Sequence, residues 1–251
     1  MRYSNQIHTA KRKSVLKNHR KSSLITLAWF FVLFAIVAVF VNFTKLNKAD
    51  LFIGFLASLS RITIAYFIAL VIALILALFI TANERIESIF LPIFDVLQSF
   101  PSFALFPALI VALKSTEVII ITVLVITIIW PIMFSIISGI KNRREDLEEA
   151  ATIFGAHGWK RIVFFTLPQL APSIVTGSIV GWGEGWEFIV GAELLVNTHI
   201  GIGNYLGVLG TNGQNTLLAF GILILLFLLF VLNKILWLPL LTRTTKYQSE
   251  S

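Results

Sequence analysis

Carboxylates are the side chains of this sequence most able to do chemistry, and they gather in two places. One group, at positions 145–149, lies in a polar segment between two long apolar stretches. The other comprises Glu184, Glu187 and Glu193, which lie in or beside an apolar stretch. Acidic side chains at membrane depth are costly and normally face a cavity or a partner, so binding of an ion or solute is the first hypothesis for Glu184 and Glu187. The cluster at 145–149 is suited to contact basic side chains of another protein.

Other kinds of reactive site are missing from the sequence. The chain has no cysteine, which excludes disulfides, thiol catalysis and cysteine-ligated metals. It has no phosphate-binding loop of the G-x-x-x-x-G-K-[ST] type, no H-E-x-x-H and no G-x-S-x-G. The four histidines, at His8, His19, His157 and His199, show no metal-ligand spacing. We therefore expect no catalytic residue, no bound metal and no cofactor, and an intramembrane enzyme is disfavoured.

The elements that must position these acids are long apolar stretches. Of the 251 residues, 57% are hydrophobic and only 13% are charged, which indicates an integral membrane protein. Because a membrane-spanning helix needs about 20 apolar residues, the sequence predicts six such helices, at 24–43, 62–80, 89–113, 118–138, 170–190 and 217–238. Runs of this length argue against transmembrane β-strands. The predicted fold class is an all-α polytopic membrane protein.

The basic residues predict how these helices are oriented. Lysine and arginine are enriched in cytoplasmic flanks, and the tail at 1–23 is rich in both. Six crossings then place both termini in the cytoplasm, with one membrane domain at 24–240 and a second tail at 241–251. The first stretch is longer than the apolar core of a signal peptide, so we interpret it as a retained helix. The net charge of +7 lies in tails and loops, which argues against a nucleic-acid-binding protein.

The loop at 139–168 contains a short amphipathic pattern. Leu147, Ala150, Ala151 and Phe154 follow helical spacing, acidic residues precede and interleave with them, and Gly155 is suited to end the helix. Two alanines in the stripe allow close approach of another surface. The pattern fits a docking helix for a partner protein and fits equally a loop helix that lies on its own bundle.

Two of the apolar stretches carry features that allow two interpretations. Prolines in the third, at Pro92, Pro101 and Pro107, predict either a structural kink or a break that lines a pathway. In the fifth, small residues recur every four positions at Ser173, Gly177, Gly181 and Gly185. This face predicts close helix packing, within the subunit rather than at a dimer interface.

A helical wheel separates the polar side chains of the fifth stretch. Glu184 falls within the small-residue face and Glu187 lies about 60° from it, whereas Trp182 and Trp186 point to the opposite side. Instead of lining a path, the two acids can pair with a basic residue such as Arg61 or lie at the outer membrane interface.

The loop resembles a known family motif. Glu149-Ala150-Ala151, Gly155 after three residues and Phe165-Thr166-Leu167-Pro168 after nine more are similar to the EAA loop of ABC importer permeases, with Phe165 in place of the usual isoleucine. In that family the loop contacts a cytoplasmic ATPase subunit. The resemblance implies ATPase-coupling roles for Glu149, Ala150, Ala151 and Gly155, with Leu167 and Pro168 leading back into the membrane.

Further similarities point to one branch of that family. The segment 99–107 resembles its I-P-x-x-A-x-x-P segment, and Ala192-Glu193 resembles the A-E pair of nitrate, sulfonate and taurine permeases. The implied fold is that of type I ABC importer permeases. Candidate residues of the translocation path are Trp182, Glu184, Trp186, Glu187 and Glu193. Ionised carboxylates on the path would repel a purely anionic solute, which leaves open a protonated or paired acid, or a solute that carries an amine.

The resemblance also implies an assembly. Two permease copies would form a homodimer in the inner membrane, a cytoplasmic ABC ATPase dimer would hold ATP and Mg, and an extracytoplasmic solute-binding protein would dock on the outer face near 197–216. The solute would be a small organic or inorganic anion such as nitrate, sulfonate or taurine. The alternative is a secondary transporter or channel in which Glu184 and Glu187 bind ions and no ATPase takes part.

Overall fold

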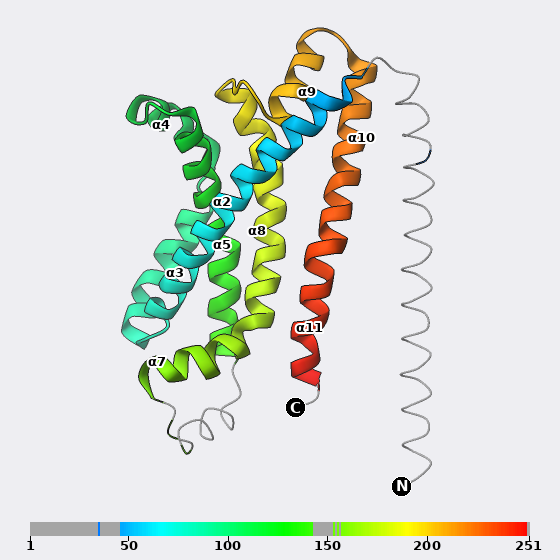
Figure 1. The fold of residues 1–251 in the computed structure, drawn as a ribbon. Coiled ribbons are helices and arrows are strands. Elements are labelled where there is room, and N and C mark those ends of the chain that lie inside the picture. Colours follow the sequence, from blue (N-terminus) through cyan, green and yellow to red (C-terminus); the bar gives the residue numbers. More distant parts are fainter. Residues whose placement is uncertain (1–34, 36–45, 143–152, 154, 156, 250–251) are drawn as a thin grey trace, which may run out of the picture.

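The computed structural model describes residues 35, 46–142, 153, 155 and 157–249, and these are almost entirely helical with no β-strand among them (Figure 1). The predicted first span at 24–43, apart from residue 35, and the predicted coupling residues Glu149, Ala150 and Ala151 lie outside the described residues. The all-α class is therefore confirmed for the described chain.

Four continuous helical stretches are long and apolar enough to cross a membrane. They are α2 (Lys48–Ile80), α5 (Thr116–Lys141), the stretch Ile162–Leu195 and the stretch Asn215–Thr244. The third consists of the π-helix η2 (Ile162–Thr166) and α8 (Leu167–Leu195), and the fourth of α10 (Asn215–Leu232), the π-helix η3 (Asn233–Trp237) and most of α11 (Leu238–Ser249). Short helices α7 (Gly158–Arg161) and α9 (Ile202–Thr211) lie at opposite ends of the bundle (Figure 1).

The predicted third span is bent rather than straight. It consists of α3 (Glu84–Gln98), a 3-10 turn η1 (Ser102–Leu105) and α4 (Phe106–Ala112), and its two halves meet at 83°. The bend falls at Pro101, which precedes η1, whereas Pro92 and Pro107 are accommodated inside α3 and in the first turn of α4. If the bent pair counts as one span, the described chain has up to five.

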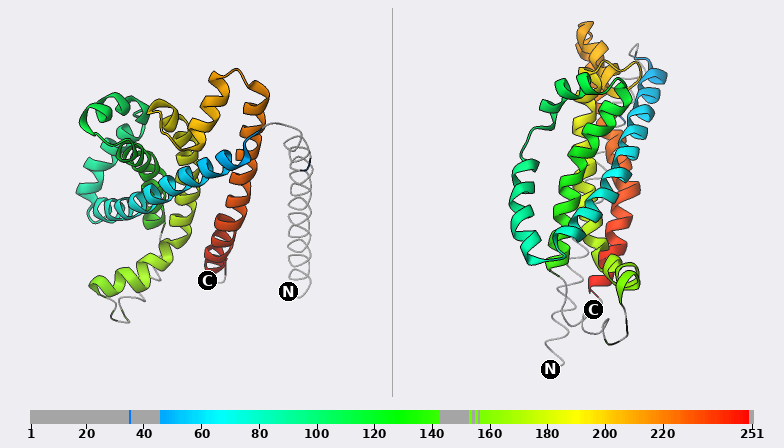
Figure 2. Two further views of the ribbon diagram at one scale, coloured as in Figure 1. Left: turned by 45° about the horizontal axis from the view of Figure 1, so that its top comes forward. Right: turned by 90° about the vertical axis from the view of Figure 1, so that its left-hand side faces the viewer.

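Aromatic side chains support the bend from within the protein. Phe103 stacks on Phe188 of α8 with ring centroids 3.7 Å apart, and Phe106 lies parallel to Phe188 at 6.3 Å. Phe106 is buried, whereas no residue of α3 is buried within the described chain. Figures 1 and 2 show α3 and α4 on one side of the bundle and α10 with α11 on the other.

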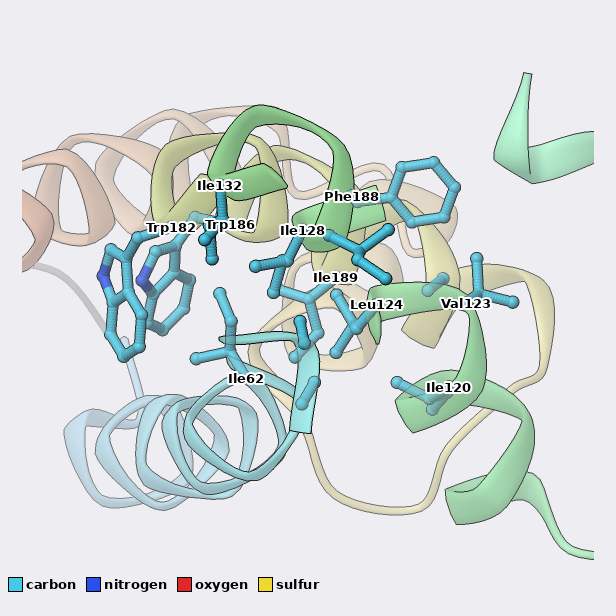
Figure 3. Packing of buried hydrophobic residues seen from close by; sticks show 14 of the residues in the cluster. Ile62, Ile120, Val123, Leu124, Ile128, Ile132, Trp182, Trp186, Phe188 and Ile189 are labelled. Carbon is cyan, nitrogen blue, oxygen red and sulfur yellow. The ribbon is translucent and has the colours of Figure 1, made fainter. Parts of the chain in front are cut away.

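The core is formed where α2, α5 and α8 pack together. Fully buried alanines recur every four residues along one face of α2, at Ala65, Ala69, Ala73 and Ala77. Such small residues let helix backbones approach closely in a membrane, where helix association depends on packing. Figure 3 shows Ile62 of α2 facing Ile128 of α5 and Ile189 of α8.

The small-residue face of α8 packs inside the subunit, as the sequence predicted. A Cβ atom on Gly177 would lie 2.8 Å from the carbonyl oxygen of Pro131, and one on Gly181 would lie 3.0 Å from that of Ile128. Ser135 also donates a hydrogen bond to the carbonyl oxygen of Ser173 at 2.7 Å. These contacts join α8 to α5 over the segment from Ser173 to Gly181.

Candidate functional site

The short helix α7, in the described part of the loop at 139–168, lies at the end of the bundle opposite α4 and α9 (Figure 1). At this end Lys141, in the last turn of α5, forms an ion pair with Glu87 of α3. Gly155 has φ +73°, a left-handed conformation that glycine adopts readily after a helix, which agrees with the predicted helix end. Gly158, with φ +55°, starts the short helix α7.

The described part of the loop presents apolar side chains to the outside. Ile153 is 83% exposed and Phe164 is 79% exposed, although the sequence analysis had not singled out either one. Ile153 precedes Gly155 in the chain, and Phe164 follows α7. Large apolar side chains exposed at the end of a membrane bundle mark a surface for a protein partner or for lipid headgroups.

The motif residues Leu167 and Pro168 begin α8. Leu167 is half-buried and its N–H bonds the carbonyl oxygen of Ile162 five residues earlier, which closes the π-helical turn η2. Proline has no N–H to give to the carbonyl four residues before it, and the wider turn ahead of Pro168 accommodates that loss. The helix therefore runs without a break from Ile162 to Leu195, from the loop to the opposite membrane face.

The five candidate path residues divide into two groups. Glu184 and Glu187 are exposed on α8, and neither forms an ion pair with another described residue. Trp182 and Trp186 are buried on the other side of the helix, as the wheel predicted (Figure 3). The wheel's placement of Glu184 within the small-residue face is wrong, because Gly181 and Gly185 of that face are buried whereas Glu184 is exposed. Trp186 stacks on Phe55 of α2 with ring centroids 5.4 Å apart.

Glu193 belongs to a buried polar network that sequence reasoning missed. It is fully buried, and its Oε1 accepts hydrogen bonds from Arg61 Nη1 and Ser58 Oγ, each at 2.7 Å. Its Oε2 accepts a hydrogen bond from the Gly203 N–H at 2.8 Å. Arg61 also donates from Nε and Nη2 to the carboxylate of Glu117, at 2.7 and 2.5 Å. We name Arg61, Glu193, Ser58 and Glu117 the outer network.

The outer network holds the start of α9 against the bundle. Glu193 accepts from the Gly203 N–H, Ser58 accepts from the Ile202 N–H at 2.9 Å, and Arg61 donates to the Ile200 carbonyl at 2.8 Å. Helix N-termini leave N–H groups without intrahelical partners, and here side chains of α2 and α8 supply them. The acid of the A-E pair therefore anchors a helix in this conformation and does not face open space.

The outer network also identifies the ion-pair partners of Arg61. The sequence offered Arg61 as a partner for Glu184 or Glu187, but the structure pairs it with Glu117 and Glu193. The signals available were a lone arginine, Arg61, just before the apolar stretch at 62–80 and an acid, Glu117, just before the one at 118–138. They could not be joined from sequence because Arg61 and Glu193 are 132 positions apart.

Within the described part of the chain, no three histidine, aspartate or glutamate side chains gather in a way that could hold a metal ion. The polar side chains of the outer network hold helices together. The exposed Glu184 and Glu187 on α8 are placed to meet a charged group from outside this subunit.

The sequence can now be compared with those of known proteins. Residues 69–238 match the family model described as binding-protein-dependent transport system inner membrane component. The chain is 27% identical over 151 residues to the bicarbonate transport system permease protein CmpB of Synechococcus elongatus, covering 60% of this chain and 54% of the relative. It is 30% identical to the nitrate import permease protein NrtB of Synechocystis, with 60% and 54% covered. With the taurine transport system permease protein TauC of Escherichia coli it shares 27% identity over 177 residues, covering 70% of this chain and 64% of the relative.

The match thus spans little more than half the length of most of these curated relatives. The match to the family model includes the bent third segment, all of α5 and α8, and the C-terminal span as far as the π-helix η3. The family model covers most of the chain and agrees with the EAA-like loop. The chain belongs to the binding-protein-dependent transport system inner membrane component family, the ABC importer permeases.

Proposed function

We propose that this chain is the transmembrane subunit of an ATP-driven importer for a small solute, and that a separate cytoplasmic ATPase docks on the loop at 139–168. The family match over 69–238 is the observation that carries the proposal. Relatives named for nitrate, bicarbonate and taurine transport support a small organic or inorganic anion as the solute.

The proposed architecture is the type I permease fold with six spans. The stretch at 24–43 would add a span to the described ones. It would be the first span of a membrane domain at 24–240 and would follow a cytoplasmic tail at 1–23. With the tail at 241–251, both termini would then be cytoplasmic. Basic residues on the loop side of the bundle, such as Lys141, Arg161 and Arg243, support this orientation.

A second copy of the chain would complete the transport path. The exposed acids Glu184 and Glu187 lie on a face of α8 that this subunit leaves uncovered, and α3 buries none of its residues in the described chain. Carboxylates within an apolar span are expensive when they face lipid, so a polar path between two copies is the better environment. Trp182, Trp186 and Glu193 would support this path from behind, because all three are buried in the subunit.

The ATPase would act through a rigid helix. Glu149, Ala150, Ala151 and Gly155 would contact it, and the exposed Ile153 would enlarge the contact. Since one helix continues from Ile162 to Leu195, a shift at the loop end would move the path face of α8 with it. ATP and Mg would be bound by the ATPase, and an extracytoplasmic solute-binding protein would deliver the solute near 197–216.

The exposed acids also bear on the solute. Two carboxylates that have no basic partner among the described residues repel a simple anion at short range, and the repulsion grows as the local dielectric falls. Among the solutes named for the relatives, taurine carries an ammonium group that these acids can attract. The geometry therefore favours a zwitterionic solute over nitrate or bicarbonate.

Co-purification and uptake test the proposal. The tagged chain would be isolated from its native membranes, its partners identified by mass spectrometry, and the complex reconstituted into proteoliposomes with labelled taurine, nitrate or bicarbonate. We expect an ABC ATPase in the complex and uptake that requires ATP and the binding protein. If the chain purifies without an ATPase and by itself passes solute down a gradient, the channel or secondary-transporter interpretation replaces this one.

A further inference from the structure

A pocket between α8, α10 and α11 has no role in the proposed transport mechanism. It has a volume of about 280 Å³ and is lined by Ile179, Phe230, Asn233, Lys234, Trp237, Leu238 and Leu241. We call it the η3 pocket, because the π-helix η3 contributes three of its residues. One of its lining residues, Trp237, contacts the buried Trp182 of α8 edge-on.

The polar groups of the η3 pocket are nearly all donors. Lys234 brings an ammonium group, Asn233 brings a side-chain amide, and Trp237 brings an indole N–H. Trp237 is only 6% exposed, and its buried Nε1 has no hydrogen-bond partner among the described residues. No carboxylate lines the pocket. A ligand that supplies an anionic acceptor together with an apolar portion matches this lining.

The backbone explains why the donors share one opening. Pro239 has no N–H for the carbonyl of Ile235, and the helix ahead of it widens into η3. There the Leu238 N–H bonds the carbonyl of Asn233, five residues earlier. Such π-helical turns are frequent at functional sites because they change which side chains lie on one face.

Lys234 lies toward the loop-side end of the stretch Asn215–Thr244, from which its long side chain can carry the ammonium group to the headgroups. Lys234 lies 19 positions after Asn215, the first residue of α10. At a rise of about 1.5 Å per residue this is roughly 28 Å, close to the thickness of the hydrocarbon layer, about 30 Å. Ile235 and Leu236 on the same turn are exposed, as expected for side chains that face acyl chains.

We propose that the η3 pocket binds an anionic phospholipid, with the phosphate held by Lys234 and Trp237 Nε1 and the first acyl carbons against Phe230 and Leu238. Two features favour a lipid over a peptide or a second copy of the chain. The ammonium group and the indole N–H share one opening with apolar side chains, and Ile235 and Leu236 beside it are exposed, as expected for side chains that face acyl chains. The proposal requires only that the chain spans the membrane, and it is independent of the transported solute.

Lipid retention measured by native mass spectrometry tests the proposal. The full chain would be reconstituted into vesicles of equal phosphatidylglycerol and phosphatidylcholine, extracted in mild detergent, and its retained lipid counted. Wild type should keep phosphatidylglycerol in preference to phosphatidylcholine. Lys234→Gln should lower that retention about tenfold, because it removes a charge-assisted hydrogen bond, and Trp237→Phe should lower it less.

Arg243→Gln is the matched control, since it removes a basic side chain on the same face but outside the pocket. It should retain lipid as wild type does. Equal retention by Lys234→Gln and wild type would overturn the proposal, and so would an equal loss in Arg243→Gln, which would indicate general surface attraction. The chain has no cysteine, so Leu238→Cys can be paired with single cysteines placed in 24–43. Complete disulfide formation there would show that this segment fills the pocket, and would also overturn the proposal.

Discussion

Replacement of Arg61 by methionine tests whether the outer network holds the fold. Arg61→Met keeps a long apolar side chain but leaves Glu193, which is fully buried, without its cation. Removing one partner of a buried ion pair costs about 3–5 kcal/mol, because the remaining charge stays desolvated. Glu117→Gln is the comparison: Glu117 is 54% exposed, and exposed pairs contribute at most about 1 kcal/mol.

A second substitution should recover part of the loss. In Arg61→Met with Glu193→Gln the buried charge is gone, yet the amide oxygen can still accept from the Gly203 N–H. We therefore expect the double variant to be more stable than Arg61→Met alone, by about 1–3 kcal/mol. Unfolding free energies in mixed detergent micelles, followed by circular dichroism, would give the order, and hydrogen exchange of the α9 amides would locate the damage. The reasoning is refuted if Arg61→Met costs no more than Glu117→Gln, or if the double variant is the least stable.

Three further changes probe the loop, the packing and the path. Glu149→Lys should weaken ATPase association at least several-fold by reversing a charge of the predicted docking helix, without loss of the folded bundle; unchanged recovery of the ATPase in pull-downs would contradict this. Gly181→Leu should lower the melting temperature in detergent and cost about 1–3 kcal/mol or more, since its Cβ would already lie 3.0 Å from the Ile128 carbonyl; unchanged melting would show that α5 and α8 are not in contact there. Glu184→Gln should alter uptake of a zwitterionic solute while dimer size on gel filtration stays the same; wild-type uptake would remove Glu184 from the path.

The long helices were predictable because apolar length is a local property of the sequence. The spans predicted at 118–138, 170–190 and 217–238 lie within the observed helical stretches. The start of α2 was placed too late, since the predicted span opens at Ile62 and the helix at Lys48. Asn47 caps that helix by accepting from the Ala49 and Asp50 N–H groups, and polar residues on its first turns lowered the hydropathy of a segment that is nonetheless helical.

The direction of the third segment could not be read from hydropathy. Three prolines signalled a change, but only the aromatic contacts around Phe188 determine that the chain turns by 83° at Pro101 while Pro92 stays inside a helix. The small-residue face of α8 was predictable for the opposite reason. Gly177 and Gly181 belong to a repeat of small residues every four positions, which predicts close packing against another helix. In the structure that helix is α5.

The candidate site was predictable as a list of residue types but not as an arrangement. Glu184, Glu187 and Glu193 look alike in the sequence, yet the first two are exposed and the third is buried and paired. The difference arises from Arg61, which comes from another helix, so no pattern within α8 contains it. The docking role of Glu149 lies outside the described residues and stays a prediction.

The separation of these acids has a consequence for transport. One unbroken helix from Ile162 to Leu195 connects the loop end, the exposed Glu184 and Glu187, and Glu193 at the outer network. A movement of that helix would carry Glu184 and Glu187 and at the same time strain the bonds that Glu193 makes to Arg61 and to α9. If the outer network opens during transport, Glu117→Gln should raise turnover without changing the folded structure, because it weakens the more exposed of the two Arg61 contacts and leaves the buried one intact. If α9 and α8 move together as one body, Glu117→Gln should leave turnover unchanged.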